Sequence, residues 1–371
     1  MSSMFLNTLS VMTREHIALS ETRRQTLCWL IFLIMRYGSV SLWRLAAHAP
    51  SKARTASVRR RFYRFFQFIH IDGCSMARMV VALSGLSGKP WTLTIDRTNW
   101  DFGKTPINIL MIAVVWNDVS IPLICSFLPK KGNSPTAERT QLLDRLREIF
   151  PDMKVAMLIG DREFVDGAWM KYLIENNIYF VMRLRSNQLV HRNGYATRSL
   201  SRLAHSLKPG DVLKLREKCR LKDGPLVRII IKRLGTGELL ILASPSKPSR
   251  ALALYRNRWT IEILFANLKT RGFDLEATHI SNPKKLATLM AILSIAMTLA
   301  TKTGWTVKRV KPVPIKQHGR KAVSIFALGL TTLKRMFAMP NDTIDLEIFE
   351  HIIKNRRLSK SKFSNACSER V

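Results

Sequence analysis

The chain has 371 residues, of which 47% are hydrophobic, and its 60 lysines and arginines against 26 acidic residues give a net charge of +34. The hydrophobic fraction excludes a disordered protein, and the length is enough for two or three domains with a sizeable core. The charge indicates a polyanionic partner, and DNA, RNA, the ribosome and anionic membranes all remain open on charge alone.

The cysteines and the first residues predict a reducing compartment. The five cysteines are widely spaced and include no C-x-x-C motif, so we expect reduced thiols in a cytoplasm and no zinc site. Residues 1–20 lack the apolar core and cleavage site of a signal peptide. The apolar runs 28–35 and 289–300 are too short to span a bilayer, so we expect core helices and no membrane partner.

Residues 1–90 predict a helical DNA-binding domain. Three helices are expected, at residues 20–37, 40–47 and 54–70. The third has an apolar stripe, and arginines that include Arg60, Arg61 and Arg64 line the remainder. A tight turn followed by an arginine-rich helix favours a helix-turn-helix-like module whose arginines contact DNA. The alternative is a generic helical bundle with a solvated basic face.

From Trp91 the pattern changes to that of a mixed sheet. Apolar or alternating strands are expected at 91–95, 108–116, 121–128, 155–159 and 178–182, and helices at 136–150 and 168–176. The first strand ends in Asp96 and the fourth in Asp161. The order β-β-β-α-β-α-β, with carboxylates at these strand ends, is that of a ribonuclease-H-like fold. We therefore expect an α+β core, a mixed five-stranded sheet with helices, over residues 91–186 and 247–302.

Two further regions complete the predicted organisation. Residues 187–246 alternate basic and apolar side chains between turn signals, which predicts a small β insertion with three strands. After a long apolar helix at about 283–302, residues 303–322 are rich in lysine, proline and glycine and are expected to form a linker or DNA-tracking loop. Residues 303–371 as a whole are predicted to be a basic helical C-terminal region. Helices are expected near 323–337 and 344–354.

An uninterrupted helix is predicted for residues 255–269. Tyr255, Arg258, Glu262 and Lys269 lie three, four and seven residues apart, which places all four near one face. Such a stripe suits a phosphodiester site, in which the cations grip phosphates and the carboxylate binds a metal. The alternative is an amphipathic helix with incidental ion pairs.

Asp96, Asp161 and Glu262 form the candidate catalytic and metal-binding set. Mg²⁺ and Mn²⁺ prefer hard oxygen ligands, and two such ions can activate the attacking oxygen and stabilise the leaving one in a displacement at phosphorus. A single aspartate after a strand is often only a turn or a helix cap, so the three in this topological order carry the assignment. Three neighbouring acids could substitute for members of the set: Asp101, Asp118 and Glu163.

These motifs resemble those of DDE transposases of bacterial insertion sequences, in the group with the signature Tyr-x2-Arg-x3-Glu-x6-Lys (YREK). All four signature positions are present, at Tyr255, Arg258, Glu262 and Lys269. The segments 95–100 and 159–164 are similar to the family's segments around its first and second aspartates. The resemblance covers roughly residues 90–300.

The resemblance implies an enzyme that binds the terminal inverted repeats of a mobile element, cleaves double-stranded DNA and joins the ends to target DNA. It implies two metal ions, Mg²⁺ or Mn²⁺, held by Asp96, Asp161 and Glu262, and contacts of the other signature residues with DNA near the cleaved end. It also implies a homodimer in the DNA-bound complex and a place in the bacterial cytoplasm, at the nucleoid.

Two alternatives and one departure from the family remain. A metal-dependent nuclease of the same fold would cut DNA without joining it, and a catalytically inactive DNA-binding regulator would do neither. In members that form DNA hairpins, an insertion tryptophan stabilises a flipped base. Residues 187–246 contain no tryptophan, so that role would fall to Tyr195, Trp259 or another aromatic side chain.

Overall fold

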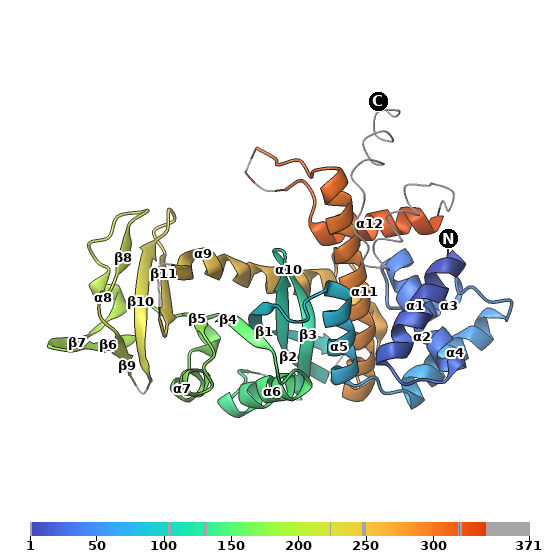
Figure 1. The fold of residues 1–371 in the computed structure, drawn as a ribbon, viewed down its shortest axis with the longest axis horizontal. Coiled ribbons are helices and arrows are strands. Elements are labelled where there is room, and N and C mark those ends of the chain that lie inside the picture. The colour runs from blue at the N-terminus through green and yellow to red at the C-terminus, as the bar shows by residue number, and fades with distance from the viewer. Residues whose placement is uncertain are drawn as a thin grey trace. The chain divides into compact units, whose positions relative to one another are not determined.

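The computed structural model describes residues 2–102, 105–128, 132–222, 224–246, 250–317, 319 and 321–338. Within them the chain forms two compact units (Figure 1). The sheet unit comprises residues 86–101 and 106–264. The helical unit comprises the described residues up to Gly85, Phe102 and Thr105, and the described residues from Phe265 onward. All three candidate carboxylates lie in the sheet unit.

The sheet unit begins with five strands. They are β1 (Pro90–Phe102), β2 (Thr105–Trp116), β3 (Val119–Leu128), β4 (Lys154–Gly160) and β5 (Phe180–Arg183), with α6 (Thr136–Ile149), the 3-10 helix η1 (Arg162–Phe164) and α7 (Gly167–Glu175) between the later ones. Their order in the sheet is β3-β2-β1-β4-β5. β4 runs parallel to β1 and to β5, whereas β3 is antiparallel to β2. The mixed sheet predicted from the sequence is confirmed.

The β2–β3 hairpin shows how the sequence fixes this arrangement. The middle of β2 is apolar and buried throughout, as expected for a central strand. Asn117 and Asp118 both have positive φ, 49° and 66°, as a two-residue type I′ turn requires. Asp118 therefore closes the hairpin, and its possible role as a substitute ligand stays a prediction.

The strands that follow β5 extend the same sheet. They are β6 (Leu189–Arg192), β7 (Tyr195–Ser199), β8 (Val212–Lys214), β9 (Cys219–Leu221), β10 (Leu226–Arg233) and β11 (Leu239–Ser244), with the short helix α8 (Leu200–Leu203) after β7. β11 pairs antiparallel with β5, and β10 with β11. The sequence predicts only three strands here. It misses β6 and β7, whose mostly exposed side chains lack an apolar alternation, and it merges β8 and β9 into one strand.

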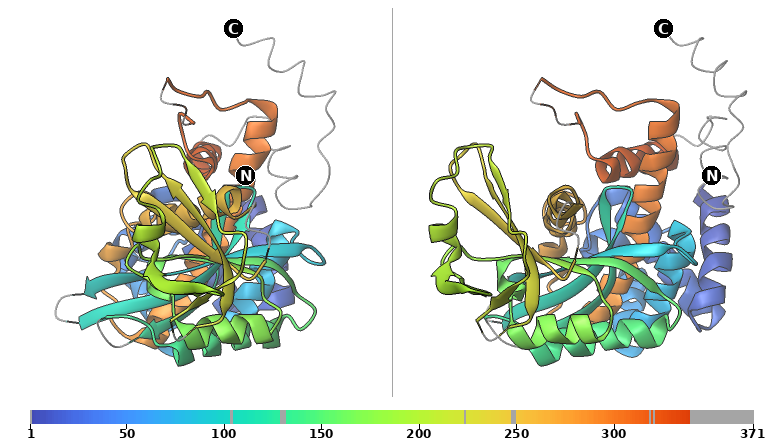
Figure 2. Two further views of the ribbon diagram at one scale, coloured as in Figure 1. Left: turned by 90° about the vertical axis from the view of Figure 1, so that its left-hand side faces the viewer. Right: turned by 60° about the vertical axis from the view of Figure 1, so that its left-hand side comes forward.

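Helices cover both faces of the sheet unit, with α6 and α7 on one face and α9 (Ala251–Tyr255) on the other (Figures 1 and 2). One buried cluster explains the position of α9. Ile159 of β4, Val181 of β5 and Leu242 of β11 pack in it with Ala251 and Tyr255. Burial of these apolar side chains holds the start of the signature segment against the strands that carry the candidate site.

The helical unit combines the N-terminal helices with those after Phe265. They are α1 (Ser2–His16), α2 (Glu21–Tyr37), α3 (Leu42–Ala46), α4 (Thr55–Phe68), α5 (Gly73–Ser84), the 3-10 helix η4 (Leu275–Thr278), α11 (Pro283–Val310) and α12 (Ile325–Ala338). Phe5, Phe32 and Phe337, from α1, α2 and α12, form an aromatic cluster with ring centroids 4.7 to 6.1 Å apart. The helical regions predicted on both sides of the core are present, and they share one core.

α11 corrects the linker expected at residues 303–322, because the helix continues into that stretch. Gly304 is one of the glycines that make this stretch resemble a linker. In the structure it lies inside α11, where α11 and α12 touch. A Cβ at Gly304 would lie 1.9 Å from the carbonyl oxygen of Ile325, and one at Gly329 would lie 1.8 Å from that of Ala300. The close backbone approach requires glycine, and the packing outweighs the low helix propensity of this residue.

Among the described residues, α11 is long and apolar enough to cross a membrane by length and composition alone, but 94% of its apolar window is buried inside the protein. A core helix of a soluble protein passes the same test, so this is weak grounds for a membrane span. The helix expected near 344–354 lies outside the described residues.

Candidate active site

Two of the predicted carboxylates occupy equivalent positions on neighbouring parallel strands. Ile95 of β1 pairs with Gly160 of β4, and Asp96 and Asp161 are the next residues on the two strands. Gly160 permits tight packing at this point, because a Cβ there would lie 2.6 Å from the sulfur of Met182. Asp161 follows the end of β4, as predicted. Asp96 does not end its strand, because β1 is hydrogen-bonded to β2 and continues well past it.

Asp96 is a half-buried carboxyl in a negative environment. Burial raises its pKa to about 7, and the charges of Glu163 and Asp161 act in the same direction. The backbone N–H of Arg97, which donates to Asp96 Oδ1 at 2.8 Å, and the charge of Arg258 act against this rise. A carboxylate in such a position is poorly neutralised by the protein itself.

Asp161 is the point at which the signature residues meet the strands. Tyr255 Oη donates a hydrogen bond to Asp161 Oδ1 at 3.2 Å. Arg258 donates through Nη1 to Glu262 Oε1, and the same nitrogen lies 3.7 Å from Asp161 Oδ2. The Arg258 side chain is only 6% exposed. One buried guanidinium therefore links the carboxylate of the strand to the carboxylate of the helix.

The segment that presents these groups is not the single helix that the sequence predicts. α9 ends at Tyr255, a 3-10 turn η3 (Arg256–Arg258) follows, and α10 spans Trp259–Leu268. Thr260 accounts for the local change, because its hydroxyl donates to the carbonyl of Asn257 at 2.6 Å and competes with the helical ladder. The same hydroxyl lies 2.5 Å from Ser120 Oγ on β3 and so ties α10 to the sheet.

The described residues do not gather three His, Cys, Asp or Glu side chains closely enough to hold a metal ion. Asp96 and Asp161 are strand neighbours, and Arg258 stands between Asp161 and Glu262. The donor set is nevertheless of the right chemistry, since carboxylate oxygens are the ligands that Mg²⁺ and Mn²⁺ prefer. Burial is the main cause of the raised pKa of Asp96, and the charges of Glu163 and Asp161 add to it, so a divalent cation would relieve part of this rise. The residues present fit such an ion by their donor chemistry, whereas their positions in the described structure do not bring three of them together.

The sequence does not predict an ion pair that lies next to the carboxylates. Arg97 Nε donates to both oxygens of Glu163, at 3.0 and 2.8 Å, and Arg97 Nη2 donates to Asn133 Oδ1 at 3.0 Å. This contact joins β1 to the segment that follows Asp161. Sixty-six positions separate Arg97 from Glu163, and no motif connects them. The carboxylate of Glu163 is thus paired with Arg97, the residue that follows Asp96 in the chain.

Contacts of Lys269, Tyr195 and Trp259 with DNA remain predictions. Lys269 follows α10 in the helical unit, where its backbone N–H donates to the carbonyl of Phe265 at 3.0 Å. Burial lowers the pKa of Lys269, and the charge of Glu276 opposes this. Tyr195 and Trp259 of the sheet unit are 57% and 62% exposed, as a stacking platform for a base requires.

The three arginines of α4 differ from one another. Arg61 donates to Thr26 Oγ1 at 2.7 Å, and its guanidinium lies over the ring of Trp29 at 4.4 Å. It therefore braces α4 against α2. All three arginines line a cavity of about 520 Å³ in the helical unit, and the exposed side chains of Arg60 and Arg64 are open to a ligand there. Contact of these residues with DNA stays a prediction.

Comparison with known families gives one match over most of this region. The sequence model of the family described as "Transposase DDE domain" matches residues 88–299. These residues include both strand aspartates and the whole signature segment. No curated protein matches the chain.

Solved structures give weak similarities only. A piggyBac transposase synaptic complex with hairpin DNA aligns over 98% of this chain and 82% of that one, with 12% identity and a TM-score of 0.42. The catalytic domain of human endonuclease V aligns over 67% of this chain and 99% of that one, with 13% identity and a TM-score of 0.28. TM-scores of this size carry no conclusion about this chain.

Proposed function

The chain belongs to the transposase DDE domain family, and from this premise we propose that it binds the ends of a mobile element, cleaves the DNA there and joins the ends to target DNA. One observation carries the proposal. Asp161, the neighbour of Asp96 across two parallel strands, is contacted by both Tyr255 and Arg258 of the signature segment. Residues far apart in the sequence thus meet at one carboxylate.

In this proposal Asp96, Asp161 and Glu262 hold divalent ions, Mg²⁺ or Mn²⁺, and we propose two. Such ions supply activation of the attacking oxygen and stabilisation of the leaving oxygen. Tyr255 orients Asp161 through its hydroxyl, and Arg258 offsets the repulsion between Asp161 and Glu262. Arg97 fixes Glu163 and keeps a fourth carboxylate out of the donor set.

The partners follow from the same chemistry. Double-stranded DNA of element ends and of the target is the proposed substrate, in keeping with the net charge of +34. Lys269 would grip a phosphate near the cleaved strand, and Arg60 and Arg64 would contact the end sequence. The DNA contact predicted for Arg258 is replaced by its buried contacts with Asp161 and Glu262. We propose a homodimer on DNA, membership of the YREK group of bacterial insertion sequences, and action at the nucleoid in the cytoplasm, without a membrane partner.

A cleavage and joining assay tests the proposal. The substrate is a duplex that the protein itself selects from a random-sequence pool, hereafter the selected duplex, incubated with supercoiled plasmid in Mg²⁺. We expect nicked or cut duplex together with plasmid that carries a joined duplex end. Cleavage without joining would assign a nuclease, and binding without cleavage would assign a DNA-binding regulator.

A further inference from the structure

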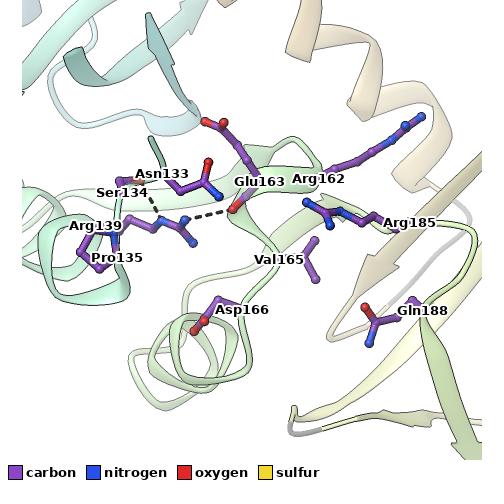
Figure 3. A pocket seen from close by; sticks show the side chains of 10 residues that line it. All are labelled: Asn133, Ser134, Pro135, Arg139, Arg162, Glu163, Val165, Asp166, Arg185 and Gln188. Carbon is purple, nitrogen blue, oxygen red and sulfur yellow. Dashed lines mark hydrogen bonds between the residues drawn. The ribbon is translucent and has the colours of Figure 1, made fainter. Parts of the chain in front are cut away.

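A cavity of about 570 Å³ opens in the sheet unit beside the segment that follows Asp161. Three stretches form its wall: residues 133–139 at the start of α6, residues 162–166, and residues 185–188 between β5 and β6 (Figure 3). Cavities of this size hold a ligand of several atoms, such as one nucleotide unit, rather than a bare ion. None of the predicted catalytic or signature residues lines it.

Two arginines approach this cavity from opposite walls (Figure 3). Arg139 is only 4% exposed, and its guanidinium is held by Ser134 Oγ at 3.0 Å and by the carbonyl oxygen of Glu163 at 2.9 Å. Its Nη1 has no hydrogen-bond partner in the described part of the chain. Arg185 is exposed and makes no side-chain hydrogen bond or ion pair with any described residue. One cation is thus fixed in the wall, and a second is free to close on a ligand.

The acidic groups around the cavity are already committed. Glu163 is paired with Arg97 at 2.8 Å. Asp166 caps α7, accepting from the backbone N–H of Trp169 at 3.0 Å and from the hydroxyl of Thr136 at 2.7 Å. Partial burial opposes ionisation of Asp166, but these hydrogen bonds lower its pKa. The charge left without a partner in the cavity is therefore positive.

We infer that this cavity, here called the arginine pocket, binds a backbone phosphate of the DNA strand that runs past the carboxylates. Arg185 supplies the ionic contact and Arg139 a fixed donor, while the amides of Asn133 and Gln188 suit the sugar and base edges of one nucleotide. Arg162 and Glu163 follow Asp161 directly, so a phosphate held here belongs to a nucleotide near the cleaved position. The choice of DNA as the source of the phosphate rests on the proposed function.

The test combines single neutral phosphates with single arginine variants. Methylphosphonates replace the phosphates of the selected duplex one position at a time, and dissociation constants are measured in EDTA by fluorescence anisotropy for wild type, Arg185→Ala and Gln188→Ala. Arg220→Ala is the matched control, because Arg220 is an exposed arginine of β9 outside the pocket. At one or two adjacent positions we expect wild type and Arg220→Ala to lose affinity about tenfold. The same replacement should cost Arg185→Ala less than about twofold.

Independent effects of methylphosphonate and Arg185→Ala at every position would overturn the inference. Binding of inorganic phosphate to wild type, followed by ³¹P NMR, without positional coupling on DNA would assign the pocket to a free anion and overturn it equally. Cleavage of the unmodified selected duplex in Mg²⁺ keeps the two proposals apart. Coupling without cleavage would support the pocket and reject the enzyme, and cleavage without coupling would do the reverse.

Discussion

The edge of the sheet that carries Asp161 and the basic face of α4 place charges in opposite ways. At the sheet edge, Arg258 is 6% exposed and is held by Asp161 and Glu262, and Asp161 also accepts from Tyr255, so these groups are held in position before any ligand binds. On α4, Arg60, Arg61 and Arg64 line one open cavity, and among the three Arg61 alone makes side-chain hydrogen bonds to described residues. Preorganised charges serve chemistry, because their geometry is fixed in advance, whereas open charges serve affinity.

The two arrangements predict different effects of substitution. Changes at the sheet edge should alter the rate of cleavage and the stability of the fold while leaving affinity for DNA nearly intact. Changes on the open face of α4 should alter affinity and its dependence on salt while leaving the rate at saturating DNA intact.

The largest effect is expected from removal of a candidate metal ligand. Asp96→Asn, Asp161→Asn and Glu262→Gln should each reduce single-turnover cleavage of the selected duplex by about 1000-fold or more, because each loses a charged ligand for the ions. Binding of the duplex in EDTA should stay within about twofold. Asp152→Asn, at an exposed acid beyond the site, is the control. Full cleavage by any one of the three variants would remove that residue from the set.

Asp96 also predicts a dependence of stability on pH in metal-free protein. Its pKa is about 7 in the fold and about 3.9 in an unfolded chain, so the native state binds the extra proton between these values. Stability should therefore fall as pH rises from 4 to 7, by about 2–4 kcal/mol in total, and then level off. Urea unfolding in EDTA should show this fall in wild type and in Asp152→Asn but not in Asp96→Asn. Equal slopes in all three proteins would contradict the half-buried position of Asp96.

Arg258→Lys should lower cleavage at saturating DNA by about 10- to 100-fold. A lysine keeps the charge but cannot reach Glu262 and Asp161 with one planar group, and a misplacement of about 1 Å can cost on the order of 100-fold. Arg256→Lys, at the exposed neighbouring arginine, should match wild type. If Arg258→Lys were also unchanged in rate, the bridge between the two carboxylates would have no catalytic role.

The smallest effects are expected on α4, where single contacts add up. Arg60→Ala and Arg64→Ala should each weaken binding of the selected duplex about threefold to fivefold and reduce the slope of log K against log salt by about 0.9. Arg61→Ala should instead lower the free energy of unfolding by about 1 kcal/mol, because it removes hydrogen bonds to α2. If only Arg61→Ala lost affinity for DNA, then Arg61, and not Arg60 and Arg64, would be the DNA contact of α4.

Patterns along the chain predict the elements of the sheet core well, and contacts between distant residues explain what they miss. Apolar runs and the Asn117-Asp118 turn suffice for the five core strands, because each is encoded locally. The continuation of the sheet through β11 depends on pairing with β5, which no local pattern records. The linker predicted at residues 303–322 is wrong at Gly304, because this glycine allows close contact with α12 and does not end the helix.

In the candidate site too, local motifs predict some features, and contacts between distant residues determine the others. Motif order and spacing select Asp96, Asp161 and Glu262, and the structure places the first two on adjacent strands. The sequence does not predict the turn at Arg256–Arg258, because no local pattern shows that the Thr260 hydroxyl donates to the carbonyl of Asn257. Nor does it predict that Arg258 bridges Asp161 and Glu262, or that Arg97 holds Glu163, since these contacts arise only when the segments pack.

The central claim is that Asp96, Asp161 and Glu262 hold the same divalent ions when DNA is bound. Electron paramagnetic resonance of Mn²⁺, titrated into wild type on the selected duplex, tests it without relying on turnover. Wild type should bind two ions per chain with mutual spin coupling. Each of the three carboxamide variants should lose at least one ion, and Asp152→Asn should match wild type. Unchanged Mn²⁺ binding in all three variants, or none in wild type, would contradict it.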